Sequence, residues 1–142
     1  MLPMPMKKKD IEEMLKKPIV AVVAVTAPDG APHAVPTWYE YADGQVVFHT
    51  GAESFKYKCL VRDPRVTLVV DTKKTPYKTV VLKGRATLEE KVDDKRTARM
   101  AVEYLGKKLG KAYAKSLKGN KVVVVSFKPL RTISWDYSQE RP

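Results

Sequence analysis

Short runs of β-branched and aromatic residues, each closed by a turn, recur along this chain and limit the folds open to it. The clearest run is 19–26 (IVAVVAVT), which is continuous, apolar and bounded by turn residues. Such a run is typical of a strand buried on both faces. Residues 27–30 (APDG) have the chemistry of a β-turn. The two segments together predict a hairpin with residues 31–41.

The second strand of this hairpin, 31–41 (APHAVPTWYEY), carries Pro32 and Pro36. Because proline has no backbone N–H, the strand must be an edge there, or bulged, or partly open. The simplest account is an edge strand that its prolines keep from aggregating. An opening would instead leave backbone groups free beside Trp38 and Tyr39.

Further strands are predicted where similar runs stand between turns, and Gly84 is expected to form a bulge that curves the sheet. Repeated hairpins of this kind predict a mainly β fold with short helices, a strongly bent antiparallel sheet or barrel of six or seven strands. The polar tail after Tyr137 is expected to fray. The further strands are 45–50, 65–71, 78–88, 121–127 and 131–136.

Helical spacing of apolar residues appears in two places. Residues 8–15 form an amphipathic helix, so an N-terminal helix is expected at about 7–16. A helical insert is expected at about 93–117, as two helices of about 93–105 and 108–117 that Gly106 and Gly110 interrupt. With 142 residues, the chain is expected to be a single domain, 1–142.

The segment 49–66 joins a strand end to a short helix. Ser54 is a plausible N-cap, and the helix must end by Asp63 because Pro64 follows. A helix N-terminus presents free N–H groups and a positive dipole end. The hydroxyls of Thr50 and Ser54 and the charge of Lys56 complete the parts of a phosphate pocket. The alternative is an ordinary capped surface helix.

The formal net charge of +11 favours anionic ligands without choosing among nucleic acid, a phosphorylated cofactor and a membrane surface. Cys59 is the only cysteine, so no intrachain disulfide forms, and it is expected to be a small core residue. Two histidines are too few for a His-rich metal site, so no metal is expected. The sequence shows neither a signal-peptide core nor a membrane-spanning run, and a cytoplasmic protein is expected.

Taken in order, these pieces resemble the split β-barrel flavin-binding proteins related to pyridoxamine 5′-phosphate oxidase. The resemblance rests on Pro-His-Ala-Val-Pro-Thr-Trp-Tyr, Val-Val-Phe-His-Thr, and Ser-Phe-Lys-Tyr-Lys-Cys-Leu ahead of Asp-Pro-Arg-Val. It continues through the Lys-Gly-Arg-Ala strand and the helical insert to Pro-Leu-Arg-Thr-Ile-Ser-Trp. It implies a homodimer that binds two FMN molecules at the subunit interface.

The resemblance also implies which residues contact the cofactor. Lys56 would hold the phosphate, with Ser54 at the helix start, and His49 and Thr50 would touch the cofactor from the strand end. Phe55 stands where the family usually has a basic residue, so Lys58 or a lysine of the partner subunit is expected to compensate. Lys78 and Thr79 would reach the flavin of the other subunit, and Trp135 matches an aromatic residue near the cofactor. The isoalloxazine ring would be lined, largely through backbone, by Val35, Pro36, Thr37, Trp38 and Tyr39.

The implied activity is that of a flavin-dependent oxidoreductase acting on an unknown small molecule. The chain ends Trp-Asp-Tyr-Ser-Gln-Glu-Arg-Pro in place of the Arg-Leu-His-Asp-Arg type segment that binds pyridoxal phosphate, which argues against a true pyridoxamine-phosphate oxidase. Some branches of the family use a deazaflavin coenzyme or bind haem, and a non-catalytic flavin carrier or sensor is a further alternative. A basic nucleic-acid-binding β-barrel is disfavoured, because aromatic residues on a Pro-broken strand make a poor stacking platform.

Overall fold

The computed structural model describes residues 2–141, which form two antiparallel sheets and four helices. The larger sheet has the strand order β1-β10-β7-β6-β2-β3, and the smaller has the order β4-β5-β9-β8. The helices are α1 (Lys8–Leu15), α2 (Phe55–Arg62), α3 (Asp94–Leu105) and α4 (Lys107–Leu117). The strands are β1 (Leu2–Met4), β2 (Ala21–Thr26), β3 (Pro32–Thr37), β4 (Glu40–Ala42), β5 (Gln45–Thr50), β6 (Arg65–Asp71), β7 (Lys78–Arg85), β8 (Thr87–Val92), β9 (Lys121–Phe127) and β10 (Arg131–Arg141).

This arrangement confirms the predicted mainly β, antiparallel split barrel, but the described residues form ten strands where the sequence predicts six or seven. The reason is that two segments predicted as continuous strands change sheet. The segment 31–41 breaks after Thr37, and 78–88 breaks at Ala86. As a result β3 and β7 lie in the larger sheet, while β4 and β8 lie in the smaller one.

The β2–β3 hairpin forms as predicted, with β3 at the edge of the larger sheet, where its prolines need no ladder partner on the outer side. The predicted burial of β2 on both faces is wrong. Val23 and Val25 are buried, whereas Val22 and Ala24 on the opposite face are half-buried. The larger sheet therefore keeps a partly exposed apolar face along β2.

Gly84 does not form the predicted bulge. Its pairing with Val66 continues the β6–β7 register without interruption. A Cβ at Gly84 would lie 2.7 Å from the Phe127 ring and 2.9 Å from the carbonyl oxygen of Lys128. The glycine is needed because the end of β9 crosses close to β7.

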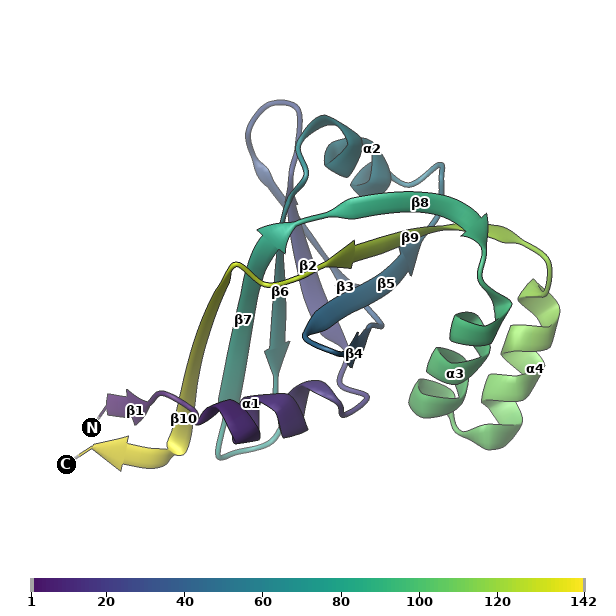
Figure 1. Cartoon of the computed structure of the whole chain (residues 1–142). Coiled ribbons are helices and arrows are strands. Elements are labelled where there is room, and N and C mark those ends of the chain that lie inside the picture. Colours follow the sequence, from purple (N-terminus) through teal and green to yellow (C-terminus); the bar gives the residue numbers. More distant parts are fainter. Residues whose placement is uncertain (1, 142) are drawn as a thin grey trace.

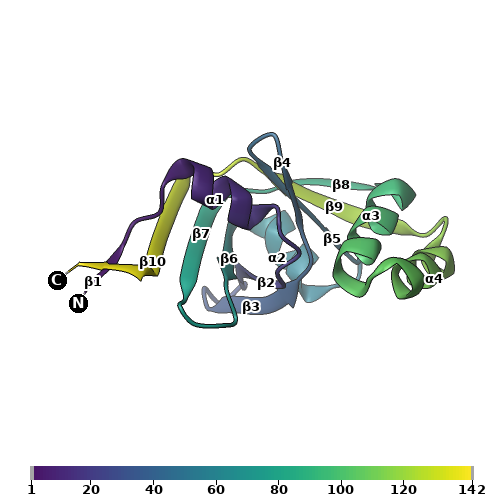
Figure 2. The same cartoon turned by 90° about the horizontal axis from the view of Figure 1, so that it is seen from below.

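The helical insert forms at the predicted place as α3 and α4, joined at Gly106, whose φ of 86° favours glycine. Gly110 does not interrupt a helix as predicted. It is buried inside α4, and a Cβ there would lie 2.5 Å from the carbonyl oxygen of Ala101. Gly110 thus allows α3 and α4 to pack closely, at the end of the molecule opposite β1 and the end of β10 (Figures 1 and 2).

The chain end also differs from its prediction. The polar tail is not frayed within the described residues, because β10 continues to Arg141 and pairs with β1, which the sequence did not predict. Helix α1 covers Lys8–Leu15, within the range expected for the N-terminal helix. No helix formed by residues 2–141 is long and apolar enough to cross a membrane.

Candidate functional site

Half of the residues predicted to contact a cofactor line one hollow of about 460 Å³, between the ends of β3 and β5 and the α3–α4 pair. This volume falls in the range of roughly 300–1,000 Å³ that is usual for small-molecule sites. One wall comes from strand ends and α2, and the facing wall comes from the helical insert. The lining residues are Val20, Pro36, Thr37, Trp38, His49, Thr50, Gly51, Lys56, Thr97, Met100, Tyr113, Leu117 and Val122.

The polar end of the hollow lies at the start of α2. Ser54 is the N-cap, and its Oγ accepts a hydrogen bond of 3.1 Å from the backbone N–H of Tyr57. The Thr50 and Ser54 hydroxyls are 2.8 Å apart. These contacts confirm the predicted cap and place two hydroxyls beside a helix N-terminus. The predicted end of the helix is also confirmed, because α2 stops at Arg62 ahead of Asp63 and Pro64.

Lys56 supplies a positive charge to this end of the hollow. Its side chain is half-buried, and its Nζ lies 5.5 Å from the centroid of the Phe48 ring. None of the ion pairs among the described side chains of residues 4–138 includes Lys56. Burial lowers the pKa of Lys56 below its ordinary value. A nearby anion would restore the stability of the charged form.

His49 is fixed by the helical insert. Its Nε2 lies 2.8 Å from the Asp93 carboxylate, and the Thr97 hydroxyl lies 3.4 Å from its Nδ1. Because a carboxylate only accepts hydrogen bonds, the proton of the neutral ring belongs on Nε2. Burial lowers the pKa of His49, and the hydrogen bond that His49 donates to Asp93 only partly offsets it. Burial therefore favours the neutral imidazole, and the contacts with Asp93 and Thr97 fix the orientation of the ring.

A chain of ion pairs continues from this contact across the base of the insert. Arg96 contacts Asp93 and also pairs with Glu40 at 3.1 Å, and Arg99 pairs with Glu40 at 3.0 Å. Burial alone would raise the pKa of Asp93, but the hydrogen bond from His49 and the charge of Arg96 lower it overall. The network fastens α3 to β4 and β5.

The apolar end of the hollow is built around Trp38. Its ring stacks on Tyr104 at 5.0 Å and meets Tyr113 edge-on at 5.8 Å. Aromatic pairs in these geometries stabilise beyond the area that they bury. Met100 and Leu117 complete this wall. The hollow is therefore polar and cationic at α2, and apolar and aromatic at the insert.

Twelve residues are predicted to contact a cofactor, and six of them line the hollow: Pro36, Thr37, Trp38, His49, Thr50 and Lys56. Ser54 adjoins it through Thr50. Val35 packs against the hydrophobic core instead. The Tyr39 side chain is buried, and its backbone N–H and carbonyl both bond the Tyr104 hydroxyl.

The other three predicted residues lie together elsewhere, where β7 begins beside β10. Trp135 pairs with Thr79 in the ladder, and Lys78 reaches to 4.0 Å from Asp136. None of the three lines the hollow of its own chain.

Sequence reasoning missed five residues of the insert side: Asp93, Thr97, Met100, Tyr113 and Leu117. Asp93 stands at the predicted start of the helical insert, a position that by itself does not indicate a contact with His49. The spacing of Tyr113 and Leu117 on one helical face signals an apolar stripe, but it does not say which surface the stripe faces.

A family model described as pyridoxamine 5′-phosphate oxidase matches residues 8–136 of this chain. No curated protein matches it. Among solved structures, the chain is similar to the conserved hypothetical protein Rv2991 of Mycobacterium tuberculosis, with 26% identity and a TM-score of 0.74 over 96% of this chain and 91% of that one.

Two further structures are less similar in sequence. One is named F420 reductase, with 18% identity and a TM-score of 0.68 over 85% of this chain and 94% of that one. The other is a FAD-binding protein of Mesorhizobium loti, with 22% identity and a TM-score of 0.67 over 96% of this chain and 99% of that one. At these identities the likeness shows a shared fold.

Proposed function

The chain belongs to the pyridoxamine 5′-phosphate oxidase family, and from this membership we propose that it binds FMN in the hollow and acts as a flavin-dependent oxidoreductase on a small molecule. In this proposal residues 1–142 are one FMN-binding domain, which works as a cytoplasmic homodimer with the cofactor at the subunit interface. True pyridoxamine-phosphate oxidase activity is not proposed, because residues 135–142 (WDYSQERP) differ from the Arg-Leu-His-Asp-Arg type segment that binds pyridoxal phosphate in that family.

The observation that carries the proposal is the half-buried side chain of Lys56, which has no carboxylate partner among the side chains that the structure describes (residues 4–138). A charge withdrawn from water without a partner is costly. A phosphate group beside Lys56 would provide the missing partner. The free N–H groups at the start of α2 and the hydroxyls of Thr50 and Ser54 supply matching donors.

The rest of the hollow fits the other parts of FMN. The wall that faces the phosphate end is apolar and aromatic, with Trp38, Met100 and Tyr113. Such a wall suits a flat ring system and keeps water from it. The donor set and the apolar wall thus match the two chemically different ends of a flavin mononucleotide.

When bound, FMN supplies the redox chemistry, and the protein supplies position, electrostatics and shielding from water. In this proposal Lys56 neutralises the phosphate charge, and the Thr50 and Ser54 hydroxyls orient it. His49 is neutral and held by Asp93, so it presents a fixed polar edge to the hollow.

The dimer is supported by where Lys78, Thr79 and Trp135 lie. In the family resemblance these residues reach a flavin, yet here they lie away from the hollow of their own chain. Only a second copy would bring them to a cofactor. Half-buried Val22 on β2 and Val20, which is 40% exposed, leave apolar surface for such a contact.

A deazaflavin coenzyme is the second candidate. The net charge of +11 and the lysines of α4 suit a ligand with several carboxylates. The similarity to a structure named F420 reductase agrees with this candidate.

The test is an absorbance spectrum of the freshly purified protein, followed by release of the chromophore and its identification by mass. Oxidised FMN bands with the matching mass are expected. A deazaflavin or a haem would replace FMN, and a colourless protein that also refuses added FMN would contradict the proposal. Turnover with NAD(P)H or a reduced deazaflavin then separates an enzyme from a non-catalytic flavin carrier.

A further inference from the structure

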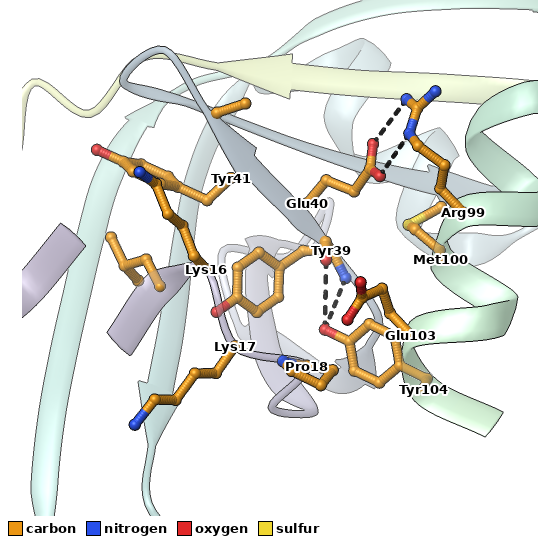
Figure 3. Close-up of a pocket in the computed structure, with 12 residues that line it drawn as sticks. Lys16, Lys17, Pro18, Tyr39, Glu40, Tyr41, Arg99, Met100, Glu103 and Tyr104 are labelled. Atoms are coloured by element: carbon orange, nitrogen blue, oxygen red, sulfur yellow. Dashed lines mark hydrogen bonds and ion pairs between the residues drawn. The ribbon is translucent and has the colours of Figure 1, made fainter. Parts of the chain in front are cut away.

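A second hollow, of about 440 Å³, adjoins the first on the other side of the segment 38–40. Met100 lines both hollows. The walls of the second one come from the end of α1, from β4 with the residue before it, and from α3 (Figure 3). It contains none of the groups assigned above to FMN phosphate binding, so its occupant is a separate question.

Several polar groups in these walls already have partners. Arg99 holds both carboxylate oxygens of Glu40, at 3.0 and 3.1 Å. The Tyr104 hydroxyl donates to the carbonyl oxygen of Ile19 at 3.0 Å and lies 3.3 Å from the backbone N–H of Tyr39. These groups line the hollow, but their existing hydrogen bonds leave few donors or acceptors for a ligand.

The Tyr39 hydroxyl is different. The residue is 4% exposed, and its hydroxyl is the only buried side-chain polar atom among the described residues that has no hydrogen-bond partner. Leaving a buried hydroxyl unpaired costs about 1–3 kcal/mol. Figure 3 shows the Tyr39 ring within the hollow, with its hydroxyl directed toward the end formed by Lys16 and Lys17.

Lys16 and Lys17 give this end of the hollow two positive charges. Both residues are exposed, and no ion pair among the side chains that the structure describes (residues 4–138) includes either of them. Their flexible side chains leave the two sides of the Tyr39 hydroxyl and extend away from it (Figure 3), and a carboxylate that accepts a hydrogen bond from the phenol would attract both ammonium groups. The opposite end offers the apolar and aromatic surface of Met100 and Tyr104 beside the exposed Glu103 carboxylate, so the ligand's own carboxylate belongs at the lysine end.

We propose that this second hollow binds a small organic carboxylate with an apolar or aromatic body. Its carboxylate accepts a hydrogen bond from Tyr39 and pairs with Lys16 and Lys17, while its body packs against Tyr104 and Met100. The Tyr39 hydroxyl has almost no exposed surface, so the side chains packed around it must shift for the ligand to reach it. Lys16 and Lys17 can turn toward the bound carboxylate, because no ion pair among the described side chains fixes them.

The test is a titration of the full-length protein with acetate, hexanoate and benzoate, followed by NMR shifts of backbone amides. Benzoate is expected to shift the amides of residues 15–17, 39–42 and 99–104, and benzamide is not. Tyr39→Phe is expected to weaken benzoate binding about tenfold or more, since a hydrogen bond to a charged group is lost. Lys16→Ala combined with Lys17→Ala is expected to weaken it further.

Tyr41→Phe is the matched control, because Tyr41 lines the same hollow while its hydroxyl points away from it (Figure 3) and already donates to Glu12 at 3.0 Å. It is expected to leave benzoate affinity unchanged. The unliganded Tyr39→Phe protein is expected to be as stable as the wild type or more so, because an unpaired buried hydroxyl is removed.

Three results would overturn the proposal. The first is that none of the three carboxylates shifts the amides of this hollow. The second is that Tyr39→Phe binds benzoate as tightly as the wild type. The third is that Tyr39→Phe unfolds at a clearly lower temperature, which would mean that the hydroxyl has a structural partner. These results are distinguishable from a failure of the FMN proposal, because no side chain replaced in these variants lines the FMN hollow.

Discussion

The two walls of the proposed cofactor hollow arise in different ways. The α2 wall is assembled from residues close in sequence, because Thr50, Ser54 and Lys56 lie within one strand-to-helix turn. The insert wall is assembled across the chain, since Trp38 meets Tyr104 and Tyr113, and His49 meets Asp93. The first wall follows from local chemistry, whereas the second depends on how α3 and α4 pack on the sheets.

The comparison predicts that the α2 wall rests on the hydrophobic core. Phe48 is fully buried beneath Lys56, so Phe48→Ala is expected to lower the free energy of unfolding by about 3–5 kcal/mol. Phe55→Ala is the control on the same wall, because Phe55 is 48% exposed, and its expected cost is about 0.5 kcal/mol or less. Urea unfolding measures both. Equal losses of unfolding free energy in the two variants would show that packing of Phe48 in the core does not hold the α2 wall.

Substitutions in the insert wall are expected to lower the free energy of unfolding less than Phe48→Ala does in the α2 wall. Gly110→Ala places a Cβ against the backbone of α3, and an expected loss of about 1–3 kcal/mol follows from overpacking. The loss should appear although alanine is a better helix former than glycine by about 1 kcal/mol. Hydrogen exchange should report it in α3 and α4 rather than in β2 or β6. Exposed Lys111→Ala is the control, and faster exchange in both variants would contradict the account.

The His49 contact gives the insert wall a dependence on pH. Burial lowers the pKa of His49 below 6.5 in the folded protein, so the unfolded chain binds the proton more readily. The contribution of His49 to stability is therefore complete above about 6.5 and is lost as the pH falls through the folded pKa. His49→Gln should flatten this part of the pH profile measured by urea unfolding, and His33→Gln should leave it intact. An unchanged profile in His49→Gln would reject the assignment.

The smallest expected effect concerns the outer ion pair. Arg99 is 56% exposed where it pairs with Glu40, so Arg99→Ala should cost about 0–1 kcal/mol. Arg96→Ala should cost more, since Arg96 joins Glu40 to Asp93 and is 23% exposed. Thermal unfolding of the two variants compares them directly. If Arg99→Ala lowers the stability more than Arg96→Ala does, Arg99 and not Arg96 is the more important member of the ion-pair network.

Much of the fold follows from the sequence because the signals are local. Turn residues after β2, proline at the β3 edge, the Ser54 cap and the stop before Pro64 each act on neighbouring backbone. The same reasoning placed α1 and the α3–α4 pair. It placed Gly84 and Gly110 correctly as special positions but gave them the wrong reason, because both are required by close approach of distant backbone.

Local sequence patterns did not predict two features: the point at which the chain passes from one sheet to the other, and the wall of the hollow formed by α3 and α4. No residue pattern within the segment 31–41 indicates that the chain leaves the larger sheet after Thr37. The position of this break depends on where β5 and β9 lie. Likewise Asp93 becomes a partner of His49 only after α3 packs on β5. Residues 44 apart in sequence meet through tertiary packing, which a single sequence does not encode in any short pattern.

The placement of the phosphate at Lys56 can be tested by comparing the binding of FMN with that of riboflavin, which lacks the phosphate. Flavin fluorescence gives both affinities for the wild type, for Lys56→Ala and for the exposed control Lys108→Ala. The wild type and the control should prefer FMN, and Lys56→Ala should lose about tenfold or more of that preference while its riboflavin affinity stays nearly unchanged. If Lys56→Ala keeps the full preference for FMN, the phosphate does not lie at Lys56 and the proposed site is wrong.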